Sequence, residues 1–599
     1  MPPITRLAHA MPFGTELYDG GTRFRVWAPA RASASVIVDG EERVMDRHAE
    51  GWFALEVPGA GAGTPYQFAF GELHVPDPAS RFQPNGVHGP SIVVDPCAYT
   101  WTQTAWRGRP WHEIAIYELH VGTFTAQGTY AAAIERLDHL AALGVTAIEL
   151  MPLAQPAGTR NWGYDGVLPF APQHAYGTPD ELKALIDAAH ARGLCVFLDV
   201  VYNHFGPEGN YLGAYAPQFF TERHHTPWGA AINYDGEHAA VVREFFIQNA
   251  VYWLHEYAID GLRLDAVHEI RDDSPRHILD ELAARVRAEL PRDREIHLVL
   301  ENDANQARFL DRYDAQWNDD AHHAFHVLCT GESAGYYDDY ADDPIRAAGR
   351  ALAEGFAYQG EASRHRGGAP RGEPSASLPS TAFVDFLQNH DQIGNRALGE
   401  RLTMLASAES VRAAAAVVLL APAIPLLFMG EEWAASTPFL FFSDFGPELA
   451  HAVTEGRRHE FAAWPAFSDP RARERIPDPQ DPATMRACVL AWDERTRGEH
   501  AAMLAHYRQL LALRAGVVVP RLRDGINGDG FQILAERTLR VRWRCGDGSR
   551  LGVVANLGDA PASVSYAFDG VAFYTLGEVP PRADGTVLAP WSVGWFITS

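Results

Sequence analysis

The chain has 599 residues, of which 47% are hydrophobic and 11% aromatic, and a formal net charge of −26 at pH 7. The length predicts several domains, and the apolar content is sufficient for sizeable cores. The strong negative charge argues against nucleic acid and anionic membranes as partners, whereas it carries no penalty for a neutral ligand.

The first residues after Met1 include no apolar stretch, so we expect no signal peptide. Five scattered cysteines without a C-x-x-C pair are typical of reduced thiols and predict neither a disulfide framework nor a cysteine metal site. We therefore expect a cytoplasmic protein, and we expect it to act as a monomer.

Residues 21–100 show the two-residue alternation of β-strands and no helical period. Residues 24–27 and 66–70 are predicted strands. The strand at 36–38 is followed by Asp39-Gly40, which is typical of a hairpin turn. We predict an immunoglobulin-like β-sandwich domain over residues 1–105.

From about residue 110 predicted strands alternate with predicted helices. The helix that starts near Thr178 has the clearest signal, because Pro179 and Glu181 complete a capping box. The predicted strands cover residues 114–121, 145–151, 195–201, 261–267, 296–301, 382–388 and 426–429. The predicted helices cover residues 131–143, 178–192, 238–257 and 275–289. This alternation predicts a parallel (β/α)8 TIM barrel over residues 106–515.

An uninterrupted apolar run from residue 413 to residue 430 is long enough to resemble a membrane span. It contains Pro422 and Pro425 and is followed at once by Glu431 and Glu432. We therefore predict a buried helix, a break and a short buried strand.

Two further segments differ from the barrel pattern. Residues 205–234 are rich in Gly, Pro, Tyr and His without a period, and we predict an excursion over the barrel mouth at about 205–235. Apolar residues alternate again at Leu539, Val541 and Trp543, which predicts a C-terminal antiparallel β-sandwich over residues 516–599.

Polar clusters follow several predicted strands at the point where each ends. They are Asn203-His204, Asp265 with His268, Glu301, and His390-Asp391. Active sites of such barrels lie at the carboxyl ends of the strands, so we expect these side chains to meet. Arg263 and Asp265 lie on the same face of one predicted strand. Burying these two charges is costly unless they pair with each other.

Such a cluster suits two chemistries. Carboxylates and imidazoles could hold a divalent cation for hydrolysis, or two carboxylates could flank a glycosidic bond. Neighbouring aromatic residues favour sugar, although each fits core packing equally well, and no H-E-x-x-H motif favours a metal. These aromatic residues are Tyr117, Trp162, Tyr164, Trp317 and Trp433.

In the glycosidase interpretation the two carboxyls take different roles. Arg263 favours the ionised form of Asp265, as a nucleophile requires. Glu301 follows apolar residues, and burial would hold a proton on it for the leaving oxygen. Direct attack by Asp265 predicts retention of configuration, with the two carboxyl groups roughly 5–5.5 Å apart.

Four blocks, at residues 199–204, 261–268, 298–303 and 386–391, resemble the signature regions of the α-amylase superfamily, glycoside hydrolase family 13. The resemblance implies that Asp265 is the nucleophile, Glu301 the acid/base and Asp391 the stabiliser of the transition state. It also implies that Arg263, His204 and His390 contact glucose. Residues 25–29 resemble the carbohydrate-binding-module-like sandwich that precedes branching and debranching members; we expect this domain to pack on the barrel.

Narrower stretches, at residues 202–212, 300–303, 314–323 and 387–396, resemble the malto-oligosyltrehalose trehalohydrolases. In that family the parts that correspond to residues 319–323 and 390–395 line the substrate site. The further substrate contacts that we expect are His268, Tyr164, Asp319, Asp320, His322, His323, Gln392 and Asn395.

The resemblance implies hydrolysis of the α-1,4 bond next to the terminal trehalose of maltooligosyl trehalose, with related α-1,4-glucans as further ligands. We predict no cofactor and no required metal. The alternative within the superfamily is a glycogen branching or debranching enzyme. A non-catalytic glucan-binding protein is a further alternative, but binding alone does not need three carboxylates around one bond.

We predict that Asp265→Ala and Glu301→Gln each lower turnover at least about a thousandfold, because each removes a group that acts on the scissile bond. Sugar release from an α-1,4-glucan, measured beside the circular-dichroism spectrum, tests this. Near-wild-type turnover in either folded variant would refute the assignment.

Overall fold

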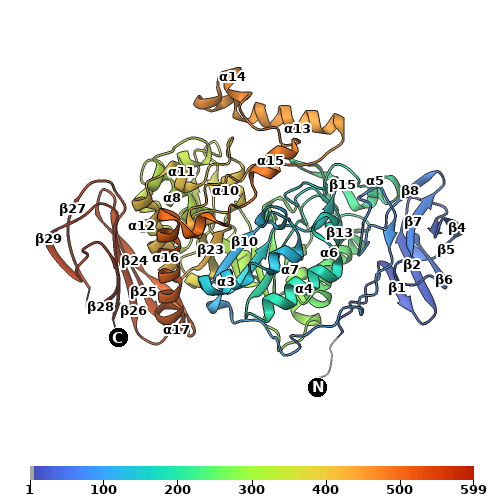
Figure 1. The fold of residues 1–599 in the computed structure, drawn as a ribbon, viewed down its shortest axis with the longest axis horizontal. Coiled ribbons are helices and arrows are strands. Elements are labelled where there is room, and N and C mark those ends of the chain that lie inside the picture. The colour runs from blue at the N-terminus through green and yellow to red at the C-terminus, as the bar shows by residue number, and fades with distance from the viewer. Residues whose placement is uncertain (1–5, 569, 599) are drawn as a thin grey trace.

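The computed structural model describes residues 6–568 and 570–598, and its centre is a closed barrel of eight parallel strands (Figure 1). Neighbouring strands follow chain order, and β10 closes against β23. The strands are β10 (Ile116–Leu119), β11 (Ala147–Leu150), β14 (Cys195–Val200), β17 (Gly261–Leu264), β18 (His297–Leu300), β19 (Ala315–Trp317), β22 (Phe383–Phe386) and β23 (Ile424–Phe428). The predicted TIM barrel is confirmed.

All seven predicted strands are present, but the sequence pattern did not show the eighth. Strand β19 has only three residues and lies between Asp314 and Asn318, so no alternation is visible. Helix α8 (Asp319–Thr330), which follows it, was not predicted either. The predicted strand at 261–267 ends at Leu264, because Ala266 takes a left-handed backbone conformation with φ of 40°.

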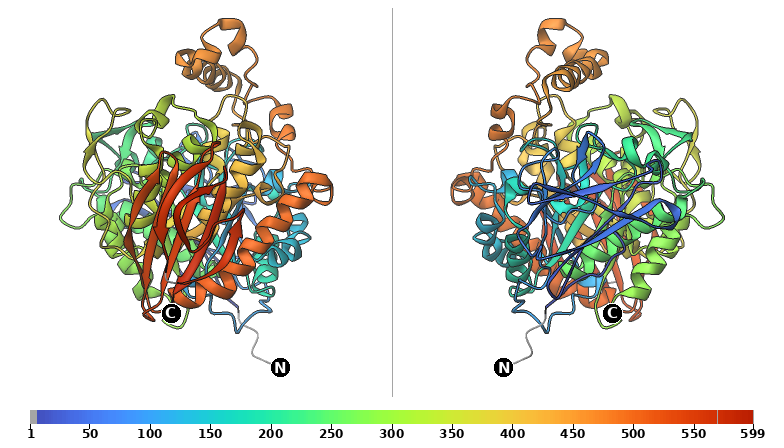
Figure 2. Two further views of the ribbon diagram at one scale, coloured as in Figure 1. Left: turned by 90° about the vertical axis from the view of Figure 1, so that its left-hand side faces the viewer. Right: turned by 90° about the vertical axis from the view of Figure 1, so that its right-hand side faces the viewer.

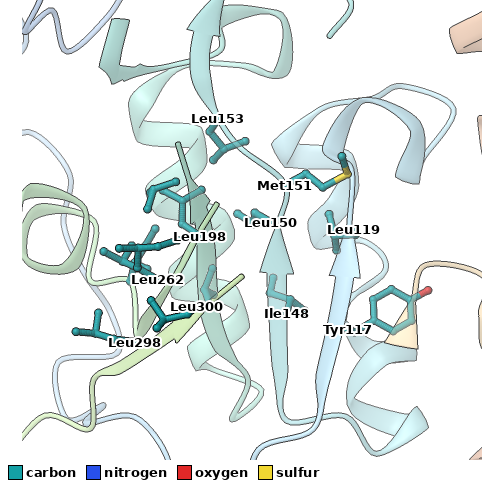
Figure 3. Packing of buried hydrophobic residues seen from close by; sticks show 14 of the residues in the cluster. Tyr117, Leu119, Ile148, Leu150, Met151, Leu153, Leu198, Leu262, Leu298 and Leu300 are labelled. Carbon is teal, nitrogen blue, oxygen red and sulfur yellow. The ribbon is translucent and has the colours of Figure 1, made fainter. Parts of the chain in front are cut away.

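The barrel strands separate two apolar clusters by alternation. Outward-facing residues such as Ile148, Leu198 and Leu262 join one large cluster with residues of the surrounding helices (Figure 3). Inward-facing residues such as Phe197 and Trp317 form a separate cluster inside the barrel. The barrel is therefore a packed core, with its remaining inward positions near the strand ends available to polar side chains.

Helices surround the barrel much as the sequence predicted. Those predicted at 178–192, 238–257 and 275–289 correspond to α4 (Pro179–His190), α6 (Ala239–Glu256) and α7 (Ile278–Glu289). The capping box of Thr178 and Glu181 is present. Further helices are α9 (Pro344–Glu354), α12 (Ala408–Leu420) and α16 (Gly498–Leu513).

The predicted helix at 131–143 is wrong in its continuity. It forms two helices, α2 (Tyr130–Ile134) and α3 (Leu137–Leu143), with a break at Arg136. At this break the Arg136 guanidinium lies 4.8 Å from the centre of the Trp492 ring. A cation–π contact of this kind stabilises the broken form.

The apolar run at 413–430 forms α12, a break and strand β23, as predicted. Buried Arg514 donates hydrogen bonds to the carbonyls of Leu419, Ala421 and Ala423, which satisfies the end of the helix. Among residues 6–568 and 570–598, every helix is too short or too polar to cross a membrane.

Antiparallel β-structure lies on opposite sides of the barrel (Figures 1 and 2). The N-terminal part has two sheets, in the orders β1-β2-β6-β5 and β4-β3-β7-β8, and the predicted hairpin joins β3 to β4. Their strands are β1 (Gly14–Tyr18), β2 (Gly21–Trp27), β3 (Ser35–Val38), β4 (Glu41–Val44), β5 (Asp46–Arg47), β6 (Trp52–Pro58), β7 (Pro65–Phe70) and β8 (Leu73–Val75).

The C-terminal part has a five-stranded sheet, β24-β25-β26-β30-β28, and a two-stranded one, β27-β29. Its strands are β24 (Ile526–Ala535), β25 (Thr538–Cys545), β26 (Arg550–Asn556), β27 (Ala562–Ala567), β28 (Val571–Leu576), β29 (Arg582–Leu588) and β30 (Ser592–Thr598). The indole N–H groups of Trp543 and Trp595 donate to the carbonyls of Leu352 on α9 and Ala416 on α12. This part therefore completes the polar contacts of two barrel helices.

Two segments project from the barrel. Helices α13 (Pro447–Glu460) and α14 (Pro470–Arg473), which were not predicted, extend beyond one end of it (Figures 1 and 2). The predicted excursion contains the short helix α5 (Leu212–Tyr215) and a hairpin of β15 (Phe220–Thr226) and β16 (Gly229–Ile232).

A buried ion pair joins the N-terminal part to the barrel. Arg81 donates to both carboxylate oxygens of Glu256 on α6 at 3.3 Å, and also to the carbonyls of His9 and Thr15. Both side chains are almost fully buried. Removal of one partner would leave an uncompensated buried charge.

We expect Arg81→Met to destabilise the protein by about 3–5 kcal/mol, because Glu256 would remain buried without its partner. Urea-unfolding midpoints would measure the loss. Arg23→Met is the matched control: Arg23 also pairs with carboxylates, Glu16 and Glu56, but at the exposed surface, and little change is expected. Equal midpoints for the two variants would contradict the structural role of Arg81.

Candidate active site

A cleft of about 380 Å³ lies where the barrel strands end. It brings together eight of the residues predicted from the sequence: the carboxyls of Asp265, Glu301 and Asp391, with Arg263, His204, His390, Tyr164 and Asn395. Its other lining residues are Trp162, Asp165, Trp228, Ala266 and Phe441. Segments more than 200 residues apart in the chain thus supply one site.

Arg263 lies at the centre of the site and is only 2% exposed. Its Nη1 lies 2.7 Å from Asp199 Oδ2 and 2.9 Å from Asp265 Oδ1, and its Nη2 lies 3.6 Å from Glu301 Oε2. Its guanidinium carbon lies 4.2 Å from the centre of the Trp317 ring. Burial disfavours the charge of Arg263, but the surrounding carboxylates outweigh this and raise its pKa.

Asp265 follows directly after β17, and two groups orient its carboxylate. Arg263 binds Oδ1, while the Asn203 side-chain amide donates to Oδ2 at 2.9 Å and to the Asp265 carbonyl at 2.8 Å. The next residue, Ala266, has the left-handed conformation that turns the chain out of the strand. The carboxylate is thus held by side chains from β17 and from the loop after β14.

Glu301 follows β18, the neighbouring strand, and the backbone N–H of Ala266 donates to its Oε2. Burial raises the pKa of Glu301 well above its ordinary value; Arg263 opposes this, while Asp265, Asp319 and Asp391 add to it. Glu301 therefore keeps a proton at a pH where an ordinary carboxyl has lost it. An ionised and a protonated carboxyl on adjacent strands can act as nucleophile and acid.

Asp391 lies in the first turn of α10 (His390–Gly394), with Asn389 as the N-cap. Asn395, one turn later, donates its side-chain amide to Asp391 Oδ1 at 2.5 Å. The Asp391 side chain is exposed at the cleft. It is therefore free to accept hydrogen bonds from a bound ligand.

Two of the aromatic residues considered in the sequence lie in the cleft. Tyr164 donates its hydroxyl to Asp199 Oδ2 at 2.6 Å, and its ring stacks on His390. Trp162 packs edge-on against His390. The other three, Tyr117, Trp317 and Trp433, are buried in the core and cannot stack on a ligand.

The sequence analysis did not assign several contributors to the site, among them Trp228, Asp199 and Glu118. Trp228, on the hairpin of the excursion, stacks its ring parallel to His204 at 4.1 Å and is 50% exposed. Asp199 and Glu118 lie below the cleft and bind its residues. The signal for each of these two was a single carboxylate inside an otherwise apolar strand, and Asp199 also begins one of the four signature blocks.

The Trp228 hairpin is tied down at its base. His224 Nε2 lies 2.8 Å from Asp235 Oδ2 and 3.7 Å from Asp273 Oδ2. In the described part of the chain these three side chains are the one group that could hold a metal ion. Arg223 also pairs with Asp235, so these contacts connect strand β15 of the hairpin to the segments that contain Asp235 and Asp273.

Several predicted contacts lie beside the cleft rather than in its lining. Gln392 donates to Asp319 at 3.4 Å, and burial raises the pKa of Asp319 to about 7. His268 accepts a hydrogen bond from the backbone N–H of Asp303.

Asp320 and His322 are buried and are not among the residues that line the cleft. Asp320 has no exposed surface and binds Arg371, Tyr340 and backbone N–H groups. His322 is buried, stacks on Phe386 and bonds the Leu387 carbonyl. His323 is also buried, with its ring against Tyr336. Because α8 was not recognised, the inward face of this segment could not be assigned from the sequence.

Comparison with known families supports the chemistry of this site. The family model described as alpha amylase, catalytic domain, matches residues 104–223. A model described only as a domain of unknown function matches residues 527–595, within the C-terminal sheets.

Curated relatives cover nearly the whole chain. A malto-oligosyltrehalose trehalohydrolase of Deinococcus radiodurans is 44% identical over 562 residues, 92% of this chain and 91% of the relative. One of Arthrobacter ramosus is 44% identical over 85% of this chain and 89% of the relative. A Salmonella typhimurium crystal structure with a provisional alpha-amylase name is 45% identical, with a TM-score of 0.92 over 99% of this chain and 100% of that one. The chain therefore belongs to the malto-oligosyltrehalose trehalohydrolase family, within the alpha-amylase group.

Proposed function

We propose that this protein hydrolyses the α-1,4-glucosidic bond next to the terminal trehalose of maltooligosyl trehalose, and so releases trehalose and a maltooligosaccharide. This is the activity named for the relatives that match about nine-tenths of the chain. The observation that carries the chemistry is that Asp265 and Glu301, at the ends of adjacent strands, both face the Arg263 guanidinium. The reaction belongs to trehalose biosynthesis.

In the first step Asp265 attacks the anomeric carbon of the glucosyl unit. The bond from this carbon to the leaving oxygen breaks, and Glu301 gives its proton to that oxygen, so that trehalose leaves as a neutral alcohol. Arg263 and Asn203 hold the Asp265 carboxylate in place for the attack.

In the second step a water molecule replaces trehalose. Glu301, now ionised, takes a proton from the water, whose oxygen attacks the anomeric carbon and releases Asp265. Two displacements at one carbon retain its configuration, and they require the two carboxyl groups to lie roughly 5–5.5 Å apart.

The remaining cleft residues position the sugar. We assign Asp391, His390 and His204 to hydroxyl groups of the ring at the scissile bond, and the Tyr164 ring to stacking against it. Asp391 is the exposed carboxylate among them and would strengthen its hydrogen bonds as positive charge develops on the ring. The substrate is neutral, so the charge of −26 does not oppose binding.

Product analysis on two matched substrates tests the substrate assignment. We expect rapid trehalose release from a maltooligosyl trehalose and slow attack on maltohexaose, with retained configuration by NMR. Equal attack on both would replace the proposal by a general α-1,4-glucanase. Activity only on branched glucan, cut or formed, would indicate a debranching or branching enzyme.

The raised pKa of Glu301 predicts a specific pH dependence. The protonated fraction of Glu301 falls as pH rises through its pKa, so kcat/KM on maltooligosyl trehalose should decline in that range. On α-maltotriosyl fluoride, whose leaving group needs no proton, the same decline should be absent. Identical declines on both substrates would contradict Glu301 as the acid.

A further inference from the structure

Glu118 is a buried carboxylate below the cleft that binds both the backbone and the side chain of His390. It lies on β10 and is 1% exposed. Its Oε2 accepts the backbone N–H of His390 at 2.9 Å, and its Oε1 lies 2.5 Å from His390 Nδ1. Glu118 is 272 residues from His390 in the chain, so only the closed barrel brings them together.

The hydrogen-bond partners of His390 decide its protonation. Nδ1 faces the Glu118 carboxylate, so it carries a hydrogen. Nε2 lies 2.8 Å from the Tyr164 hydroxyl. The Tyr164 hydroxyl has one hydrogen, and Asp199 Oδ2 lies closer to it, at 2.6 Å, than His390 Nε2 does, so we assign that hydrogen to Asp199 and the donor role to Nε2. With this assignment both ring nitrogens carry hydrogen, and His390 is an imidazolium.

Charge pairing among the buried groups agrees with this assignment. Asp199 pairs with Arg263, and Glu118 pairs with His390. Glu149, directly beside Glu118 in the barrel register, is fully buried, and neither of its oxygens has a hydrogen-bond partner among the described residues. Burial raises the pKa of Glu149 well above its ordinary value, and Glu149 makes no hydrogen bond to His390, so it does not compete with Glu118 for the ring.

We propose that Glu118 is a positioning residue, which keeps His390 doubly protonated and fixes both its ring and its backbone in the cleft. The imidazolium then presents a constant positive charge and a fixed N–H direction beside Tyr164. Because His390 and Asp391 are adjacent in α10, the same grip on the backbone N–H also places Asp391. Glu118 itself is buried and is not among the residues that line the cleft, whereas His390 is, so Glu118 acts through His390.

Other groups around His390 also affect its charge. Burial lowers the pKa of His390, but the charge and hydrogen bond of Glu118 outweigh it, and Asp391 adds to the rise while Arg263 opposes it. The remaining titratable neighbours are Asp199, Tyr164 and His120. Without the Glu118 charge, the lowering effect of burial would dominate.

The test is Glu118→Gln, which keeps the shape of the side chain and removes its charge. The measurement is kcat/KM against pH on α-maltotriosyl fluoride, where the Glu301 proton is not needed. The proposal about Glu118 rests on the proposed function only in so far as the protein is a retaining α-glucosidase. Trehalose release by the wild type is measured separately. For Glu118→Gln we expect kcat/KM to fall as pH rises. The midpoint of this fall should lie at least about one pH unit lower than the midpoint of any fall in the wild type. At neutral pH the loss should be about tenfold.

Two variants separate this role from ordinary packing. Glu149→Gln removes a neighbouring buried carboxyl that makes no hydrogen bond to His390, so we expect an unchanged pH profile. Glu118→Asp retains the charge and should recover the wild-type profile, even if the shorter side chain lowers kcat. A normal profile for Glu118→Gln, or the same shift in Glu149→Gln, would overturn the proposal.

Neutron diffraction on wild-type crystals at pH 7.5 provides a measurement that needs no variant, should Glu118→Gln fail to fold. We expect deuterium on both His390 nitrogens. A single deuterium would show a neutral ring and overturn the proposal, whatever the product specificity of the enzyme.

Discussion

The arrangement of the site depends on one buried guanidinium. Arg263 lies within 3.6 Å of oxygens from Asp199, Asp265 and Glu301, which come from the ends of three adjacent strands. Three carboxyls at this spacing in a medium of low dielectric would repel one another or take up protons. Because one cation serves all three, their environments can differ: Asp265 accepts a hydrogen bond from Arg263 at 2.9 Å, while burial raises the pKa of Glu301 well above its ordinary value.

The barrel accommodates these charges because its interior has two layers, an apolar core and a polar layer at the carboxyl ends of the strands. Phe197, Val299 and Trp317 pack inside the barrel, and the Trp317 ring supports the Arg263 guanidinium. Above this apolar layer the chain leaves each strand in a loop that can carry a polar side chain without disturbing the core. The N-terminal and C-terminal sheets lie at the sides, so the ends of the strands are left to the excursion hairpin and to α10 (Figure 1).

What the sequence predicted well was local. Strands such as 195–201 and caps such as Thr178 depend on neighbouring residues, and a polar residue after an apolar strand is a local signal that led to Asp265, Glu301 and Asp391. What it missed depends on contacts between distant segments. Strand β19 is recognisable only from its neighbours β18 and β22, and Glu118 only from its pairing with His390. The burial of Asp320 also depends on such a contact, because its partner Arg371 is 51 residues away.

The two tryptophans that join the C-terminal sheets to the barrel also bear on how the protein is made. Trp595 lies near the end of the chain, and its indole N–H is the partner of a carbonyl on α12, a helix made nearly 180 residues earlier. During synthesis the surface of α12 that Trp595 contacts has no such partner until β30 has been made. The packing of α12 against the C-terminal sheet can therefore form only after the barrel strands themselves are complete.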